Sequence, residues 1–410
     1  MSYTKEEAIE FIHEHDVKFV KLSFCDPFGT LKNISLLASH IDDAFEHGVC
    51  FDASCIEGFG NVGGAELYLF PIPETLTLLP WRPSHGRVAR MMCRLCNPDG
   101  TPFALDGREL LRIATRRALE AGVLLNIRAE CEFYLFKTDD SGLPTNTPSD
   151  FAGYLDVNPA DKGENVRRDI CLTLEEMGVM PESSHHEAGP GQNEIDFRYG
   201  DPLTSADNVI TFRNVVSSVS ANYGLWATFA PKPIPDKPGN GFHINFTVYH
   251  FPDRTPAPET GEAFMAGILD HIRGLTAFLN PTPASYERMG TFKSPSQIGF
   301  SQKHHNLLIT LPALAGDGQL HGDNFKLRSA DSSSSPYLAY TLLIYAGLDG
   351  IARKLTLPQA LNADTTDALP LLPKSLDEAI GAAREDRVIL DALGKTLAGQ
   401  ILDIYENSGR

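Results

Sequence analysis

The pattern of apolar and polar residues changes near residue 105. Before it, short strand-like runs such as VKFVKLSF (17–24) alternate with turn signals such as NPDG (97–100). After it comes a helical pattern, followed by strands that alternate with helices. We therefore predict a small N-terminal β-rich domain, residues 1–104, and a larger domain, residues 105–410.

Two helix starts carry a capping-box signature, in which a small polar residue precedes a glutamate by three positions. Thr4 and Glu7 predict one helix near the start of the chain, and Asp106 and Glu109 predict another that runs to about Ala121. The second helix opens the larger domain.

The larger domain mixes both periodicities. NIRAECEFYLF (126–136), NEIDFRY (193–199) and FHINFTVY (242–249) alternate as strands do, whereas NVRRDICLTLEEMGV (165–179) has helical spacing. This mixture, in a chain of 410 residues, predicts an α+β fold with two domains.

Charge and hydropathy narrow the classes of partner. A formal charge of −18 argues against nucleic acid or an anionic membrane as the main partner. The first residues lack a signal-peptide pattern, and the longest apolar stretch (336–352) is interrupted by Gly and Asp and is too short to span a bilayer. We expect a cytoplasmic protein.

The seven cysteines are scattered, and mostly lie inside apolar runs. Cys93 and Cys96 form a lone C-x-x-C without a second pair. This favours reduced, structural thiols over metal or redox chemistry.

Paired acids supply the first candidate chemistry. In the strand AECEFYLF (129–136), Glu130 and Glu132 point to the same face, about 7 Å apart. Two carboxylates on an apolar strand are tolerated if the face is solvated, if a proton is shared, or if cations lie between them.

More acids lie beside glycine-rich turns. Glu187 and Glu194 flank a Gly-Pro-Gly turn that brings them back to one place, and His243 and Asn245 share one face of another strand. Four glutamates and a histidine suit Mg²⁺ or Mn²⁺ better than zinc. The candidate metal ligands are Glu130, Glu132, Glu187, Glu194 and His243. Of the adjacent His185 and His186, at most one can face the acids.

In this order, several stretches resemble the type I glutamine synthetase family. They include FDASCIEGF, AECEFYLF, SHHEAGPGQNEIDFRYGDPLTSADNVITF, GNGFH, NPTPASYERMG and LRSADSSSSPYLAY, and the match covers nearly the whole chain. The resemblance implies a catalytic domain with a curved antiparallel sheet and flanking helices. It also implies self-association into rings, commonly two stacked hexamers, with active sites between subunits.

The resemblance further implies two divalent metals, Mg or Mn, and ATP. In that family ATP phosphorylates the substrate carboxylate and ammonia displaces phosphate. The first metal site matches Glu132, Glu187 and Glu194. The second matches Glu130, His243 and position 326.

The resemblance also implies which residues contact the substrates. Ammonium sites of the family match Asp52, reached from the next subunit, with Tyr154 and Glu187. Substrate carboxylates meet arginines matching Arg288 and Arg328, near Gly239 of the glycine-rich stretch. Asp52, Glu187 and Arg328 are the expected catalytic residues.

The sequence departs from the family pattern mainly at the positions that would bind phosphate and the second metal. Lys326 replaces a metal-binding glutamate, Lys293 replaces the flap glutamate, Asn245 replaces a histidine, and residues 299–312 contain no arginine. Lys326 either forms an ion pair with Glu130 or, with Lys293, contacts phosphate as a point charge. Other candidate replacement cations are Lys303, His304 and His305.

Three functions remain open. The first is a diverged carbon–nitrogen ligase joining a glutamate-like acid to ammonia or another amine. The second is a silent, ring-forming homologue with a binding or regulatory role. The third is metal-dependent amide chemistry without ATP.

Overall fold

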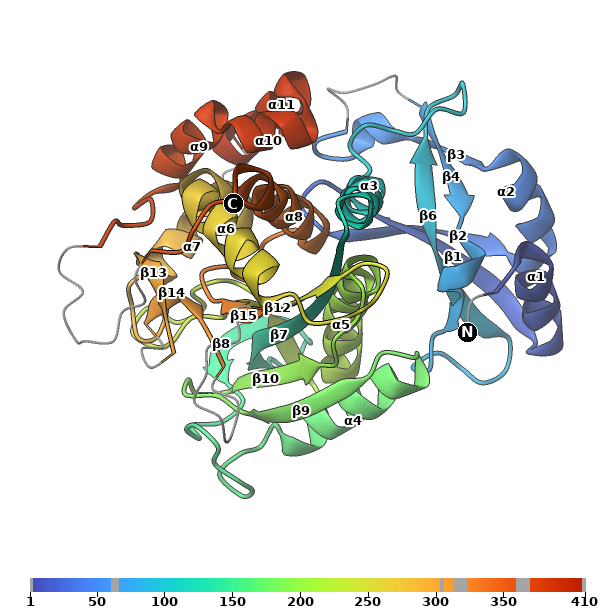
Figure 1. Ribbon diagram of the computed structural model, residues 1–410. Helices are drawn as coiled ribbons and strands as arrows, with labels where there is room; N and C mark the ends of the chain where they lie inside the picture. Colours follow the sequence, from blue (N-terminus) through green and yellow to red (C-terminus); the bar gives the residue numbers. More distant parts are fainter. Residues whose placement is uncertain (1–2, 60–65, 303–305, 313–322, 359–368, 408–410) are drawn as a thin grey trace.

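The computed structural model describes residues 3–59, 66–302, 306–312, 323–358 and 369–407, which fold around two β-sheets (Figure 1). The first sheet has six strands in the order β2-β1-β6-β4-β3, with β5 beside β6. β1 and β6 run parallel, and the other pairs are antiparallel. The strands are β1 (Val17–Cys25), β2 (Leu31–Leu37), β3 (Val49–Asp52), β4 (Glu66–Pro71), β5 (Thr77–Leu78) and β6 (Arg87–Cys96). The helices α1 (Lys5–Glu14) and α2 (Ile41–His47) pack against this sheet.

The second sheet has nine strands and carries the candidate chemistry. Its order is β13-β14-β15-β12-β7-β10-β9, with β8 and β11 also paired to β7. All pairs are antiparallel except β13 with β14. The strands are β7 (Val123–Thr138), β8 (Pro144–Pro148), β9 (Pro181–His186), β10 (Gln192–Phe197), β11 (Leu225–Thr228), β12 (Phe242–His250), β13 (Gln297–Ser301), β14 (Leu307–Thr310) and β15 (Asn324–Leu327).

Helices cover one side of the second sheet. α5 contacts β7 and β11, α6 contacts β12 and β15, and α8 packs on α6 and α3 (Figure 1). The helices are α3 (Gly107–Glu120), α4 (Glu164–Glu176), α5 (Pro202–Asn222), α6 (Pro258–Leu279), α7 (Pro283–Arg288), α8 (Pro336–Arg353), α9 (Leu376–Glu385), α10 (Arg387–Leu393) and α11 (Lys395–Asn407).

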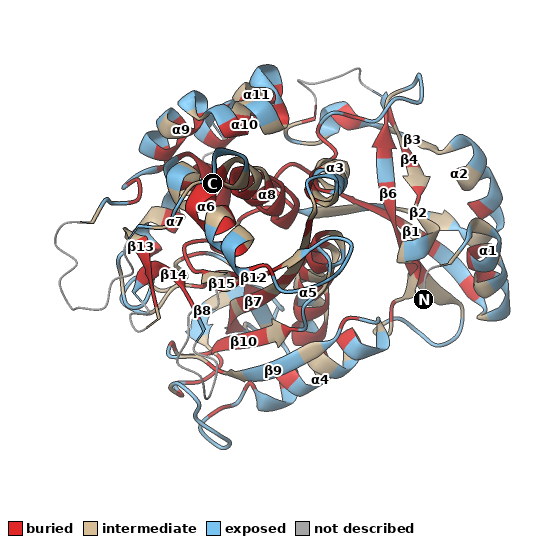
Figure 2. Cartoon of the chain, viewed as in Figure 1, coloured by how far each residue is buried: buried red, intermediate tan, exposed pale blue. Residues whose placement is uncertain are grey.

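The core lies between the second sheet and these helices, as the buried residues in Figure 2 show. On β12, Phe242, Ile244 and Phe246 are fully buried. Because successive side chains of a strand point to opposite faces, His243 and Asn245 point away from this core. Burial of one face of the strand therefore fixes the direction of its polar residues.

Most sequence-based expectations for the fold are confirmed. Thr4 and Glu7 form the predicted capping box. Asp106 caps α3, but Glu109 binds Arg112 at 2.5 and 2.7 Å, so that part of the expected capping box is wrong. The α+β fold class, with a β-rich first part and an open second sheet, is confirmed. The boundary between residues 104 and 105 stays a prediction.

Two further expectations concern cysteines and membranes. All seven cysteines are free, and Cys93 and Cys96 are buried. Within the described ranges, none of the helices has the length and apolar character needed to cross a bilayer.

Candidate functional site

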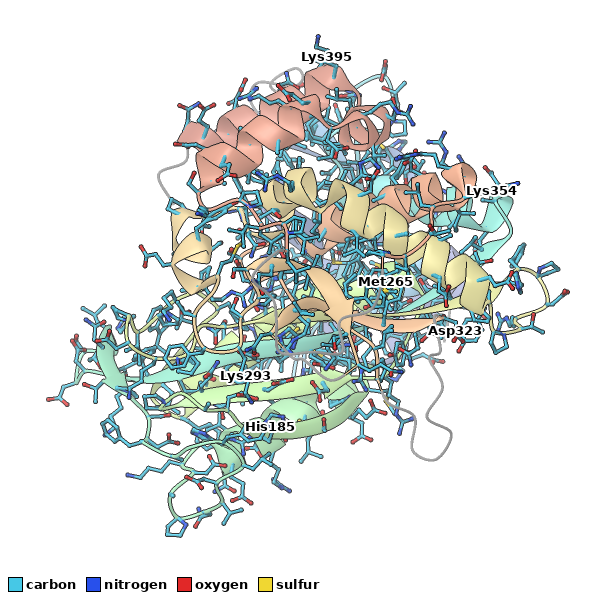
Figure 3. All side chains as sticks on the ribbon, turned by 60° about the vertical axis from the view of Figure 1, so that its left-hand side comes forward. His185, Met265, Lys293, Asp323, Lys354 and Lys395 are labelled. Carbon is cyan, nitrogen blue, oxygen red and sulfur yellow. The ribbon has the colours of Figure 1, made fainter. Side chains whose placement is uncertain are left out.

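A cavity of about 930 Å³ opens on the face of the second sheet away from the helical core. Its walls come from β7, β9, β10, β12 and β15, the segment 238–241, and the residues that follow α7. Figure 3 shows this side, with His185 and Lys293 labelled near one another across the strands. Most of the predicted site residues line this cavity, and Asp52 does not. Those that line it are Glu130, Glu132, Tyr154, Glu187, Glu194, Gly239, His243, Asn245, Arg288, Lys293, Lys326 and Arg328.

Strand alternation and register bring these residues together. On β7, Arg128, Glu130 and Glu132 occupy every second position. The register places His243 opposite Glu130, and Asn245 lies between Arg128 on one side and Lys326 on the other. The shared face predicted for Glu130 and Glu132 therefore also includes Arg128.

One end of the cavity is acidic. Glu187 and Glu194 lie together beside His185, whose Nδ1 is 3.7 Å from Glu187 Oε1 and whose Nε2 is 3.9 Å from Glu194 Oε2. Ligand atoms of these three residues lie within 4.8 Å of one another. The turn between the two glutamates closes through a hydrogen bond from the Glu187 N–H to the Gln192 carbonyl (2.8 Å), as the glycine-rich turn predicts.

Glu132 borders this acidic end. It pairs with Glu194 across β7 and β10, and its Oε2 accepts from Gln192 Nε2 (2.8 Å) and from the Gly241 N–H (2.9 Å). Among the residues that the structure describes, it joins none of the groups whose ligand atoms lie within 4.8 Å of one another.

Burial and mutual repulsion perturb these acids. Desolvation, followed by the charge of Glu187, raises the pKa of Glu132 to about 7. Desolvation, followed by the charge of Glu132, raises the pKa of Glu194 well above its usual range. Burial of His243 lowers its pKa to about 4, so this imidazole is neutral at pH 7. Uncompensated carboxylates with a neutral imidazole nearby form a donor set that fits a hard divalent cation.

At the other end of the cavity, the negative charge of Glu130 is balanced by neighbouring donors. Glu130 Oε1 accepts from Arg128 Nη2 (2.9 Å) and Asn245 Nδ2 (3.1 Å). Its Oε2 accepts from Lys326 Nζ (2.7 Å) and lies 3.2 Å from His243 Nδ1. Desolvation would raise the pKa of Glu130, but these partners hold it well below its usual range. The ion pair between Lys326 and Glu130 is therefore present, and it occupies the carboxylate expected to bind a second metal.

The arginines expected to bind substrate lie at the cavity wall. Arg288 is buried, and its Nη2 donates to the Ser329 and Ala330 carbonyls, the latter at 2.9 Å. Its Nε–H is buried without an acceptor among the described residues. At Gly239, a Cβ would lie 2.2 Å from the Pro231 carbonyl oxygen and 2.6 Å from Arg288 Cγ, so only glycine fits there.

Two residues of the expected amine pocket contact each other. Lys293 Nζ lies 5.3 Å from the centre of the Tyr154 ring, and the edge of that ring meets His185. The position where the family carries an acid thus holds a cation over an aromatic face.

Asp52 lies elsewhere. It is exposed at the end of β3 in the first sheet, where it accepts from the Ser54 N–H (2.9 Å) and the Ser54 hydroxyl (2.5 Å). It does not line the cavity of its own chain. Any role at a site requires a neighbouring subunit.

The sequence reasoning missed some site residues and left others undecided. Arg128 was missed although it lies two residues before Glu130 on the same strand, and Gln192 was missed because no motif marks it. Of the two adjacent histidines, His185 faces the acids, whereas His186 is buried against Asp150 at 2.9 Å. Lys303, His304 and His305, proposed as replacement cations, lie outside the described residues.

Comparison with known families matches both parts of the chain. The family described as "Glutamine synthetase, beta-Grasp domain" matches residues 16–98, and the one described as "Glutamine synthetase, catalytic domain" matches residues 104–407.

Individual relatives agree over nearly the full length. The chain is similar to the glutamine synthetase of Clostridium saccharobutylicum, with 40% identity covering 97% of this chain and 93% of the relative. It is 39% identical to that of Methanosarcina mazei, covering 96% and 91%. Among solved structures, a GmaS/ADP complex superposes with a TM-score of 0.86 at 27% identity, covering 97% of this chain and 94% of that one. GmaS without ligand gives the same values.

Proposed function

This chain belongs to the glutamine synthetase family, and we propose that it is a carboxylate–amine ligase whose second metal site is replaced by Lys326. The substrates would be a glutamate-like acid, ATP and an amine. The observation that carries the proposal is the contrast within one cavity between Glu132 and Glu194, whose pKa values are raised by burial and repulsion, and Glu130, which is paired with Lys326.

Glu132, Glu187 and Glu194 would hold one Mg²⁺ or Mn²⁺. Burial and mutual repulsion raise the pKa values of Glu132 and Glu194, and a divalent cation would relieve that repulsion. Such an ion, when bound, supplies positive charge that stabilises a transferring phosphoryl group.

Lys326 would supply the second positive charge. Its ammonium group is held at 2.7 Å from Glu130, and its side chain is 29% exposed toward the cavity. Arg128 stands beside the same carboxylate. A lysine can contact phosphate as a point charge, so this pair would orient a phosphate without a second metal.

Arg328 and Arg288 would orient the acid substrate. Both line the cavity, both are largely buried, and a guanidinium group binds a carboxylate through two parallel hydrogen bonds. The substrate would also contact Gly239, where the absence of a side chain allows close approach. Glu187 would accept a proton from the amine as it attacks.

The amine would carry an organic group. Lys293 covers the Tyr154 ring, and the exposed Phe292 beside it offers an apolar contact at the cavity rim that an alkylamine can use and ammonia cannot. The likeness to GmaS, a γ-glutamylmethylamide synthetase, agrees with an alkylamine as acceptor.

Assembly into a ring would complete the site. Asp52 is exposed on the first sheet and outside its own cavity, so it would serve the site of a neighbouring chain. Members of the family are typically oligomeric. We propose a dodecamer of two stacked hexamers.

Two measurements test the ligase. Calorimetry with Mg-ATP should show binding, and phosphate release should follow when glutamate is supplied with methylamine or ethylamine, at a higher rate than with ammonium. Absence of nucleotide binding at about 10 mM would contradict the ligase.

A silent homologue is the second candidate, because Glu130 is locked by four partners and Lys293 replaces an acid. It predicts metal binding and ring assembly without phosphate release for any amine. The double variant Lys326→Glu with Lys293→Glu should then recover some glutamine formation only if the remaining cations can hold ATP.

A further inference from the structure

A second cavity, of about 380 Å³, lies outside the catalytic one. It is enclosed by the turn between β1 and β2, the middle of α5 and the segments before α7 and α8. Its lining residues outside the last segment are Phe28, Gly29, Thr30, Leu31, Ile210, Arg213, Asn214, Pro281 and Thr282; Ser332 and Ser333 complete it.

Arg213 is the charged group of this cavity. Its Nη2 donates to the Ser334 carbonyl at 3.0 Å. Within the described ranges, no carboxylate oxygen lies within 4.0 Å of its guanidinium nitrogens. A guanidinium has five N–H donors, so donors remain for a ligand. The surrounding walls are mainly apolar, with Phe28, Leu31 and Pro281 among them.

The cavity is preformed. Asp26 holds the turn between β1 and β2 by accepting from the N–H groups of Phe28 (3.0 Å) and Thr30 (2.9 Å). Gly29 has φ +78°, and a Cβ there would lie 2.9 Å from Ser335 Cα. The turn therefore lies in close contact with the start of α8. This contact holds in place the two cavity walls that the turn and the segment before α8 form.

The segment 328–335 separates this cavity from the catalytic one. It begins with Arg328 in the catalytic cavity, and Arg288 donates to its Ala330 carbonyl. The Ser332 hydroxyl lies 3.5 Å from the Glu132 carbonyl oxygen and 3.4 Å from that of Gly241. Arg213 holds the same segment from the opposite side through Ser334.

We propose that this second cavity binds a small amphipathic carboxylate, with the carboxylate on Arg213 and the hydrocarbon part against the apolar walls. A carboxylate bound there shares the guanidinium with the Ser334 carbonyl and so reaches the segment that carries Arg328. The site is distinct from the proposed ligase site and does not depend on that function.

Calorimetry on the full-length protein tests the proposal with 4-methylpentanoate and, as a neutral control of the same shape, 4-methylpentanamide. The carboxylate should bind about tenfold more tightly than the amide, because the amide lacks the charge-assisted bond. Arg213→Met should weaken carboxylate binding about tenfold, and Arg213→Lys should weaken it less. Amide hydrogen exchange in residues 329–335 should change when the carboxylate binds.

Two further variants control for binding in the catalytic cavity and for misfolding of Arg213→Met. Arg328→Met removes a cation from the catalytic cavity and should weaken 4-methylpentanoate binding far less than Arg213→Met does. Thr30→Trp, at an exposed position of the second cavity, should block binding even if Arg213→Met fails to fold. Equal binding of carboxylate and amide, no binding at about 10 mM, or loss of binding in Arg328→Met but not in Arg213→Met would each overturn the proposal.

Discussion

The two ends of the catalytic cavity solve the same electrostatic problem in different ways. At one end Glu187 and Glu194 lie together with Glu132 beside them, and burial with repulsion raises the pKa values of Glu132 and Glu194. At the other end Glu130 meets Arg128, Lys326, Asn245 and His243, and its pKa is lowered. A metal ion gains little by binding a carboxylate whose charge the chain itself neutralises. It is attracted strongly to a group of carboxylates that have no such partner.

The largest expected effect comes from the acidic end. Glu187→Gln should lower the rate of phosphate release about 1,000-fold, because it removes both a proposed metal ligand and the amine's proton acceptor. The exposed Glu176→Gln on α4 is a matched control and should leave the rate unchanged. A Glu187→Gln protein that keeps both its Mn²⁺ affinity and its rate would remove the distinction between the two ends.

The second-largest difference between the two ends of the cavity is expected in how the free energy of unfolding of the metal-free protein depends on pH. The Glu132 carboxyl has a pKa of about 7 in the folded protein against 4.5 for an unperturbed glutamate, so the folded state holds the extra proton between these values. The contribution of Glu132 to the free energy of unfolding should therefore be complete at pH 4.5 and fall by about 3 kcal/mol as the pH rises to 7.

Urea titrations of the parent protein and of Glu132→Gln from pH 5 to 8 isolate this fall, because groups common to both proteins cancel, among them His243, whose lowered pKa makes stability rise with pH up to 6.5. Saturating Mn²⁺ should reverse the fall by binding the deprotonated acids. Glu130 adds nothing in this window, because its lowered pKa gives stability that is lost only as the pH falls below 4.5. A stability difference between the parent protein and Glu132→Gln that stays constant from pH 5 to 8 without metal would count against the uncompensated acids.

Removing the cation of the compensated end should have a smaller effect. Lys326→Met leaves Glu130 buried with fewer donors and should lower the free energy of unfolding by about 2 kcal/mol. Lys395→Met, at an exposed position, is the control and should change it by less than about 0.5 kcal/mol. Equal effects of the two substitutions in urea unfolding would mean that the pair does not stabilise the fold.

The smallest effect is expected at Asn245, which is buried and donates to Glu130 at 3.1 Å. Asn245→Ala should cost about 1 kcal/mol in urea unfolding. In a double-mutant cycle with Lys326→Met, the two losses should be non-additive by at least about 0.5 kcal/mol, because both residues contact one carboxylate. Strict additivity would indicate that the two contacts act independently.

The sequence predicts the strands and their faces better than it predicts which acid is paired. Alternation on β7 and β12 places Glu130, Glu132 and His243 on one face, and the structure agrees. The partner of Glu130 comes from Lys326, 196 residues later in the chain, and depends on the register of two strand pairs. Alternation alone does not specify that register.

Strand alternation also does not determine which charged side chains pair with one another. Arg128 shares the face of Glu130 by the same alternation, yet its pairing with Glu130 and Glu182 depends on side-chain packing. Similarly, the two adjacent histidines point opposite ways, and only the buried Asp150 decides that His186 turns inward. The family resemblance supplied the positions of the site, and the pairings came from the fold.

Anomalous diffraction from crystals soaked in Mn²⁺ tests the central claim most directly. We expect one ion per chain, held by Glu132, Glu187 and Glu194, and no ion between Glu130 and His243, where Lys326 stays in place. An ion beside Glu130 with Lys326 displaced, or no ion at the acidic end, would contradict it.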